Sequence, residues 1–164
     1  MIGSIKKIFA KDNKGRAAHL ELGERGERAA VEYLIEREGF EIVATNFRVP
    51  IGRGLRGQKV TAEVDVIAYD EETLVFVEVK TRTSDEMIAP ERAVDLRKQR
   101  QIARAARRYR RLMNIVDEPY RYDVVTVIPE PAGNRIELLR SYFNDRVFLQ
   151  GKFFREHRSI ADCS

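Results

Sequence analysis

Two ionisable side chains end an otherwise apolar strand face in the segment LVFVEVK. Side chains of a β-strand alternate between the two faces of a sheet, so Glu78 and Lys80 share one face with Leu74 and Phe76. A carboxylate can bind a metal ion, and an ammonium group two residues further on can hold a water molecule beside a phosphate. The segment therefore predicts a hydrolytic site.

The preceding strand, TAEVDVIAY, brings a second carboxylate to the same place. A tight turn centred between Glu71 and Glu72 sets Asp65 directly opposite Glu78 in an antiparallel hairpin. Opposed Cα atoms lie about 4.5–5.5 Å apart, and two like charges there destabilise a sheet unless a positive group lies between them. A divalent cation removes that conflict, and hard oxygen ligands at this spacing favour Mg²⁺ or Mn²⁺.

The same register sets Glu63 opposite Lys80, which predicts an ion pair that positions the lysine. A loop one residue longer or shorter would undo both pairings. On residue types alone, Asp65 and Glu78 are equally well explained as strand-end acids paired with Lys80 or with nearby arginines, because ion-pair networks also bring acids and bases together.

A third acid comes from a helix. Glu27 precedes Ala30, Val31 and Leu34 by three, four and seven residues, so its side chain points with the apolar stripe toward the sheet. The alternative is an acid in the first turn that the helix dipole favours by about 0.3–1 kcal/mol. That alternative explains the position of Glu27 in the sequence but not its face.

The elements that position these residues follow from the hydrophobic pattern. Apolar spacing predicts a helix of about 19 residues that begins near Leu20 and stops at Gly39, and a second helix that begins at Pro90 and runs to Met113. Runs rich in β-branched residues predict strands over 40–48, 61–69, 73–81, 120–128 and 135–143, with a Gly-rich basic loop over 51–59. The order helix, three strands, helix, two strands predicts an α/β fold with a mixed sheet.

Length and composition predict one domain. The 164 residues suffice for one core, which we place at residues 19–143 between a basic arm at 1–18, mobile or briefly helical, and a basic tail at 144–164. The single Cys163 excludes an intramolecular disulfide, and we found no run of about 20 apolar residues. We therefore expect a cytoplasmic protein that does not insert in membranes.

Basic side chains gather in two places. The net charge is +4, and arginines and lysines crowd the second helix and the Gly-rich loop. They could bracket a phosphate backbone, which would give affinity and salt sensitivity but no sequence reading. A solvated helix face is the alternative. The candidate nucleic-acid-binding residues are Arg48, Arg53, Arg56, Lys59, Lys98, Arg100 and Arg104.

The segments GERGERAAVEYL, EVDVIAYDEETLVFVEVKTR, AVDLRKQRQIARAARRY and YRYDVVTV resemble, in order and spacing, the YraN-like family of endonuclease-like proteins. That family is similar to the archaeal Holliday junction resolvases of the PD-(D/E)xK superfamily, whose restriction-endonuclease-like fold is a mixed β-sheet flanked by helices. The resemblance implies a helix acid at Glu27, a metal aspartate at Asp65, a second metal carboxylate at Glu78 and a catalytic lysine at Lys80. The chain departs from the family at Ala62, where a glycine is usual, and in the enlarged loop 49–61.

These residues lead to three hypotheses. The first is a metal-dependent endonuclease in which Asp65, Glu78 and the Val79 carbonyl hold Mg²⁺ or Mn²⁺. Its substrate is nucleic acid: DNA is favoured over RNA, although the sequence does not separate the two, and branched DNA is one candidate. The second is a nucleic-acid-binding module of a repair or recombination assembly without significant turnover. The third is a metal-stabilised scaffold for a protein partner. Kinship with resolvases also suggests a homodimer.

Overall fold

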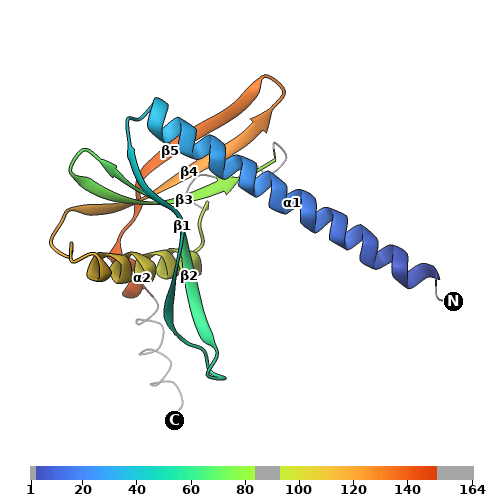
Figure 1. The fold of residues 1–164 in the computed structure, drawn as a ribbon, viewed down its shortest axis with the longest axis horizontal. Helices are drawn as coiled ribbons and strands as arrows, with labels where there is room; N and C mark the ends of the chain where they lie inside the picture. The colour runs from blue at the N-terminus through green and yellow to red at the C-terminus, as the bar shows by residue number, and fades with distance from the viewer. Residues whose placement is uncertain (1–2, 84–92, 151–164) are drawn as a thin grey trace, which may run out of the picture.

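The computed structural model describes residues 3–83 and 93–150, with side chains from residue 17 onward. It contains a five-stranded mixed sheet with one long helix on each face (Figure 1). The predicted α/β class and the order of the elements are confirmed. In chain order the elements are α1 Gly3–Glu36, β1 Glu41–Arg53, β2 Lys59–Asp70, β3 Thr73–Thr81, α2 Leu96–Leu112, β4 Tyr120–Glu130, β5 Gly133–Phe143 and the short 3₁₀ helix η2 Asp145–Phe148.

The strands lie in the sheet in the order of the sequence, β1-β2-β3-β4-β5. Every neighbouring pair is antiparallel except β3 and β4, which are parallel and are joined by the crossover that contains α2. A parallel pair needs such a crossover, because the chain must return to the same end of the sheet. Strand β3 is central, and its residues from Leu74 to Val79 are buried.

Each helix covers its own face of the sheet. Ala30 and Leu34 of α1 pack against Val75, Val77 and Val125 on one face. On the other face, Ile102, Ala105, Ala106 and Tyr109 of α2 pack against Leu74, Phe76 and Val64. Alternate residues of β3 therefore supply two separate cores, as the period of two predicts.

The ends of both helices follow the local sequence. Gly39, at φ 74°, stops α1, and the Phe40 N–H donates to the Leu34 carbonyl at 2.9 Å. The α2 helix begins later than predicted, because Asp95 caps it and accepts from the Lys98 N–H at 2.8 Å. The predicted start at Pro90 lies outside the described residues.

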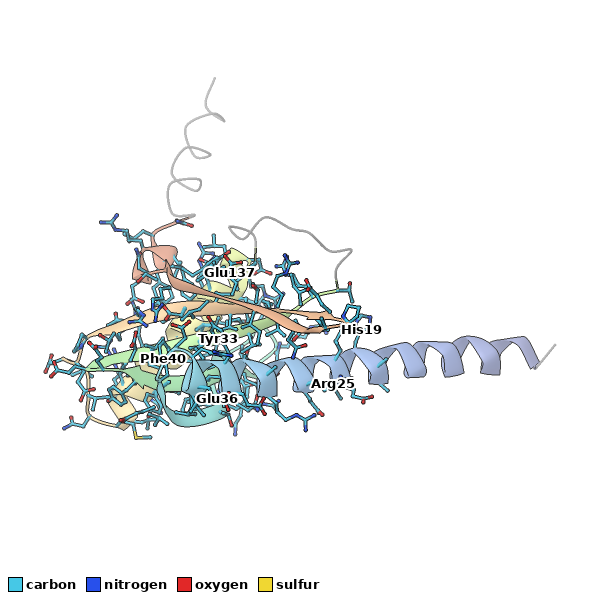
Figure 2. All side chains as sticks on the ribbon, turned by 90° about the horizontal axis from the view of Figure 1, so that it is seen from above. His19, Arg25, Tyr33, Glu36, Phe40 and Glu137 are labelled. Atoms are coloured by element: carbon cyan, nitrogen blue, oxygen red, sulfur yellow. The ribbon has the colours of Figure 1, made fainter. Side chains whose placement is uncertain are left out.

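The α1 helix is longer than the predicted 19 residues, because it begins at Gly3. Residues 3–18, which we predicted as an arm or a brief helix, continue the same helix. Its N-terminal half reaches past the sheet (Figures 1 and 2). Residues 3–18 have no periodic apolar stripe, which fits a helix half that has no sheet beneath it to bury one.

The predicted Gly-rich loop over 51–59 is partly strand, because β1 runs to Arg53 and β2 begins at Lys59. Strands β1 and β2 continue their pairing through Val49↔Ala62 and Pro50↔Thr61 to Arg53↔Lys59, which leaves only residues 54–58 as a turn. We call residues 49–61 the ribbon; it projects from the body of the sheet beyond α2 (Figure 1). Glycines and a proline weakened the strand signal in the sequence, but pairing between the two strands overrides that local preference.

Candidate metal and nucleic-acid site

Strands β2 and β3 separate at the position of Asp65. Their ladder follows the predicted register from Asp70↔Thr73 to Val66↔Val77 and ends there. Asp65 is the next residue, and its Oδ2 accepts a hydrogen bond from the Val79 N–H at 2.8 Å. A side-chain oxygen of β2 thus replaces a backbone carbonyl as the acceptor for β3. The register that sets Asp65 beside Glu78 is therefore confirmed, although the two residues are not a ladder pair.

The backbone of β2 also rotates at this point. Val64 packs in the core on the α2 side, whereas Val66 packs in the core on the α1 side. Residues two apart in a regular strand share a face, so the alternation is broken at Asp65. Opposite it on β1, Asn46 has φ 52°, and no ladder pair is formed between Thr45↔Val66 and Phe47↔Val64. This irregularity lets side chains from both faces of the sheet meet at Asp65.

Glu78 lies on the α2 face and is 1% exposed. Its Oε1 lies 2.7 Å from the Lys80 Nζ, and its Oε2 lies 3.1 Å from the Lys98 Nζ. The contact at Oε2 is an ion pair with the Lys98 ammonium, and this buried oxygen accepts no further hydrogen bond. A buried carboxylate oxygen with incomplete hydrogen bonding is costly, and it fits a site for a cation.

Asp65 is held in an unfavourable environment for a charged group. Burial and the charge of Glu78 raise its pKa from 3.8 to about 7, against the lowering effect of the Val79 N–H and of Lys98. Two carboxylates close together with incomplete compensation are expected where a cation binds. Lys98 is affected in turn: burial alone would lower its pKa, but Glu78 and Asp65 raise it.

Glu27 approaches the same place from α1. It is half-buried and shares a pocket of about 500 Å³ with Asp65 and Asn46. Burial raises its pKa, the Asn46 amide lowers it, and the charges of Glu63 and Glu78 raise it further. The predicted orientation of Glu27 toward the sheet is therefore confirmed, and α1 and α2 each contribute a charged side chain to one site.

Asn46 is a site residue that we did not predict. With its amide nitrogen turned toward the carboxylates, that nitrogen lies 3.2 Å from Glu63 Oε1 and 3.2 Å from Glu27 Oε2. The residue type matters twice, because asparagine tolerates the left-handed backbone found here and its short amide reaches both acids. A lone asparagine within a strand pattern gives no signal of this in the sequence.

The predicted ion pair between Glu63 and Lys80 is wrong. Glu63 instead pairs with Arg48 at 2.9 Å, directly across the β1–β2 ladder. Beyond Val66 the strand β2 has only β1 as a neighbour, so Glu63 finds its partner there. Lys80 forms its ion pair with Glu78, two residues earlier on the same strand.

The donor set fits a hard divalent cation. Asp65 and Glu78 offer carboxylate oxygens, and the backbone carbonyl of Val79 is the third predicted ligand. Within residues 3–83 and 93–150, no group of three His, Cys, Asp or Glu side chains has the geometry of a metal site. Mg²⁺ in proteins usually keeps several waters and takes only one or two carboxylates.

The predicted basic residues divide into three places. Lys98 and Arg48 lie in the site itself, each paired with a glutamate. Arg53, Arg56 and Lys59 are exposed at the tip of the ribbon. Two lie further along α2: Arg100, which donates to the carbonyl oxygens of Val147 and Gln150, and Arg104, which lines an open groove.

Comparison with known proteins places the chain in a family. The model of an uncharacterised protein family, UPF0102, matches residues 26–127. A UPF0102 protein of Bacteroides thetaiotaomicron is 42% identical over 132 residues, which are 80% of this chain and 99% of the relative. One of Desulforapulum autotrophicum is 41% identical over 122 residues, covering 74% of this chain and 92% of the relative. One of Geotalea uraniireducens is 41% identical over 132 residues, covering 80% and 95%.

Proposed function

This chain belongs to the uncharacterised protein family UPF0102, the YraN-like group that its sequence resembles, and we propose that it is a metal-dependent endonuclease. One observation carries the proposal. Asp65 and Glu78 lie together at the point where two strands separate, with a buried Glu78 oxygen that accepts no hydrogen bond beyond its ion pair and an Asp65 whose pKa is raised to about 7. A divalent cation would offset the repulsion between these two carboxylates and favour the ionised form of Asp65.

Asp65, Glu78 and the Val79 carbonyl would hold Mg²⁺ or Mn²⁺. When bound, such an ion supplies a Lewis acid for a phosphate oxygen and lowers the pKa of a water molecule. Lys80, at 2.7 Å from Glu78, holds a proton-donating ammonium at the edge of this position and can orient an attacking water. Glu27 adds a third carboxylate from the opposite face, with Asn46 setting its direction.

The basic side chains around the carboxylate site favour nucleic acid as the substrate class. Lysine and arginine side chains lie at the site, along α2 and at the ribbon tip, where they can neutralise phosphates. We propose DNA in preference to RNA, and a homodimer stays a prediction. In the part of the chain that the structure describes, no helix is long and apolar enough to cross a membrane.

The test is cleavage of a labelled panel of duplex, flap, junction and single-stranded DNA and of RNA, in Mg²⁺ or Mn²⁺. Wild type is compared with Glu78→Gln and Lys80→Ala, with the exposed turn residue changed in Glu72→Gln as the matched control. Loss of one cation ligand or of the lysine is expected to lower the rate by a factor of about 10² or more. Cleavage by wild type and Glu72→Gln alone supports the proposal, and cleavage unchanged in Glu78→Gln contradicts it.

A second candidate is a nucleic-acid-binding module without significant turnover. It is favoured by the two ammonium groups that already face Glu78, since Lys80 and Lys98 partly offset its charge without a metal. Binding that is complete in EDTA and unaffected by Glu78→Gln, with no cleavage by any variant, is the result that selects this candidate over the nuclease.

A further inference from the structure

A groove of about 430 Å³ lies between the ribbon and α2, apart from the carboxylate site. Pro50, Ile51 and Gly52 form its wall on the ribbon side. The opposite wall is strongly basic and is lined by Arg104, Arg107, Arg108 and Arg111 of α2.

Three of these arginines have no internal partner among the described residues. Arg107 pairs with Asp145 at 2.8 Å and stacks on Phe148. By contrast, Arg104, Arg108 and Arg111 are exposed and form no ion pair within the part of the chain that the structure describes. Arginines four and three residues apart share one helix face and repel one another, so an anionic ligand would relieve a strain that the fold leaves in place.

The spacing of these arginines suits a polynucleotide better than a single small anion. Seven residues separate Arg104 from Arg111, which is about 10 Å along the helix axis. Phosphates of one strand of a duplex advance about 3.4 Å per nucleotide along its axis. The arginine face therefore spans about three nucleotides.

The ribbon is basic as well. It carries Arg53, Arg56 and Lys59, Arg48 precedes it directly, and residues 48–62 include no acidic residue. Its tip residues, from Gly52 to Lys59, are exposed except for the half-buried Gly54. A two-stranded β-ribbon fits the major groove of B-form DNA, which is about 12 Å wide, whereas the major groove of A-form RNA is too deep and narrow for it.

The ribbon also leads directly to the carboxylate site. The Arg48↔Glu63 pair at its base lies two residues from Asp65, and the ribbon pairing continues outward from there. A duplex held by the ribbon would thus bring one of its strands near Asp65. Each wall of the groove has a different role: the ribbon enters a groove of the duplex and the arginines hold its phosphates.

We propose that the ribbon and the arginine face of α2 form a clamp for B-form duplex DNA. This inference rests on the proposed function only for its orientation toward Asp65. The clamp itself requires neither metal nor turnover.

The test is binding of a labelled DNA duplex in EDTA over a series of salt concentrations, with a single strand and an RNA duplex of the same sequence as competitors. The variant is Arg104→Ala/Arg108→Ala/Arg111→Ala. The matched control, Arg25→Ala/Arg37→Ala/Arg135→Ala, removes the same charge from exposed sites elsewhere; Arg25 lies on α1 (Figure 2).

We expect the variant to bind duplex DNA roughly tenfold or more weakly and to lower the slope of log K against log salt by about 2.7, since each phosphate contact contributes about 0.9. The control should keep the salt slope of wild type and lose only a little affinity, equally for all three nucleic acids. Equal competition by single strand or RNA duplex, or an equal loss in the control, overturns the clamp. Binding is measured without metal, so absence of cleavage in the panel above would refute the nuclease and leave this result intact.

Discussion

At the scale of single residues, the site is arranged at the expense of stability. Asp65 and Glu78 are brought together in a largely buried place, where two lysines and the Val79 N–H compensate their charge incompletely. Buried like charges destabilise a fold, so their presence points to a functional requirement. The strongest sign of function is therefore energetic, and it can be measured without knowing the substrate.

We predict that Asp65→Asn stabilises the metal-free protein. The pKa of Asp65 is about 7 in the folded protein, compared with 3.8 for an ordinary aspartate. The folded state therefore binds the proton more tightly than the unfolded state does. The stability linked to this group is complete below about pH 3.8 and is lost as the pH rises through 7. Asparagine removes that loss and keeps an oxygen for the Val79 N–H.

Urea unfolding in EDTA checks this prediction. The free energy of unfolding of Asp65→Asn should exceed that of wild type by about 1–2 kcal/mol at pH 8, and by clearly less at pH 5. The exposed Asp117→Asn serves as the control and should change little at either pH. A variant less stable than wild type at pH 8 would mean that the Asp65 carboxylate is a structural group.

At the scale of elements, the approach of α1 to the sheet determines where Glu27 lies. Gly26 is buried against Thr81 at the end of β3, and a Cβ atom at Gly26 would overlap the Thr81 side chain. Gly23, one turn earlier, has no atom within 4 Å of the corresponding position. One glycine of α1 is thus required by packing and the other is not.

We predict opposite effects for the two glycines. Gly26→Ala should destabilise the protein by about 1–3 kcal/mol, because the helix must move away from β3, and it should lower any cleavage activity by displacing Glu27. Gly23→Ala should stabilise it by about 0.5–1 kcal/mol, because alanine is the better helix former. Thermal unfolding of both variants, with Gly26→Ala/Thr81→Ala as a partial rescue, tests the contact. Equal effects of the two substitutions would show that α1 does not depend on this approach.

At the scale of the whole molecule, the ribbon stands outside the two cores. The buried residues nearest to it, Val49 and Ala62, lie at its base, and beyond them only Ile51 packs partly against the core on the α2 side. We therefore expect the rest of the protein to fold without the ribbon.

We predict that replacing residues 51–60 by Asn-Gly, which closes a hairpin on the paired Pro50 and Thr61, leaves the fold intact. Loss of the Ile51 contact should cost about 1 kcal/mol, or about 2–4 °C in Tm. Duplex DNA binding in EDTA should fall at least as far as in the triple arginine variant. Unchanged duplex binding in a folded, shortened protein would remove the ribbon from the binding surface.

Features that depend on short-range pattern could be predicted from the sequence. The order of helices and strands, the faces of β3 and the register that sets Asp65 beside Glu78 all follow from periodicity and from one tight turn. A hairpin register is local, because the turn fixes it. The family also followed from sequence, since several motifs agree in order.

Contacts between residues far apart in the chain could not be predicted in this way and became apparent in the folded structure. The fold pairs Glu63 with Arg48 instead of Lys80. It also brings Lys98, from the helix of the crossover, to Glu78, and places Asn46 between two acids. It also turned the predicted loop into a ribbon and raised the pKa of Asp65 through burial. These outcomes depend on strand neighbours and on solvent exclusion, which arise when segments far apart in the sequence pack together.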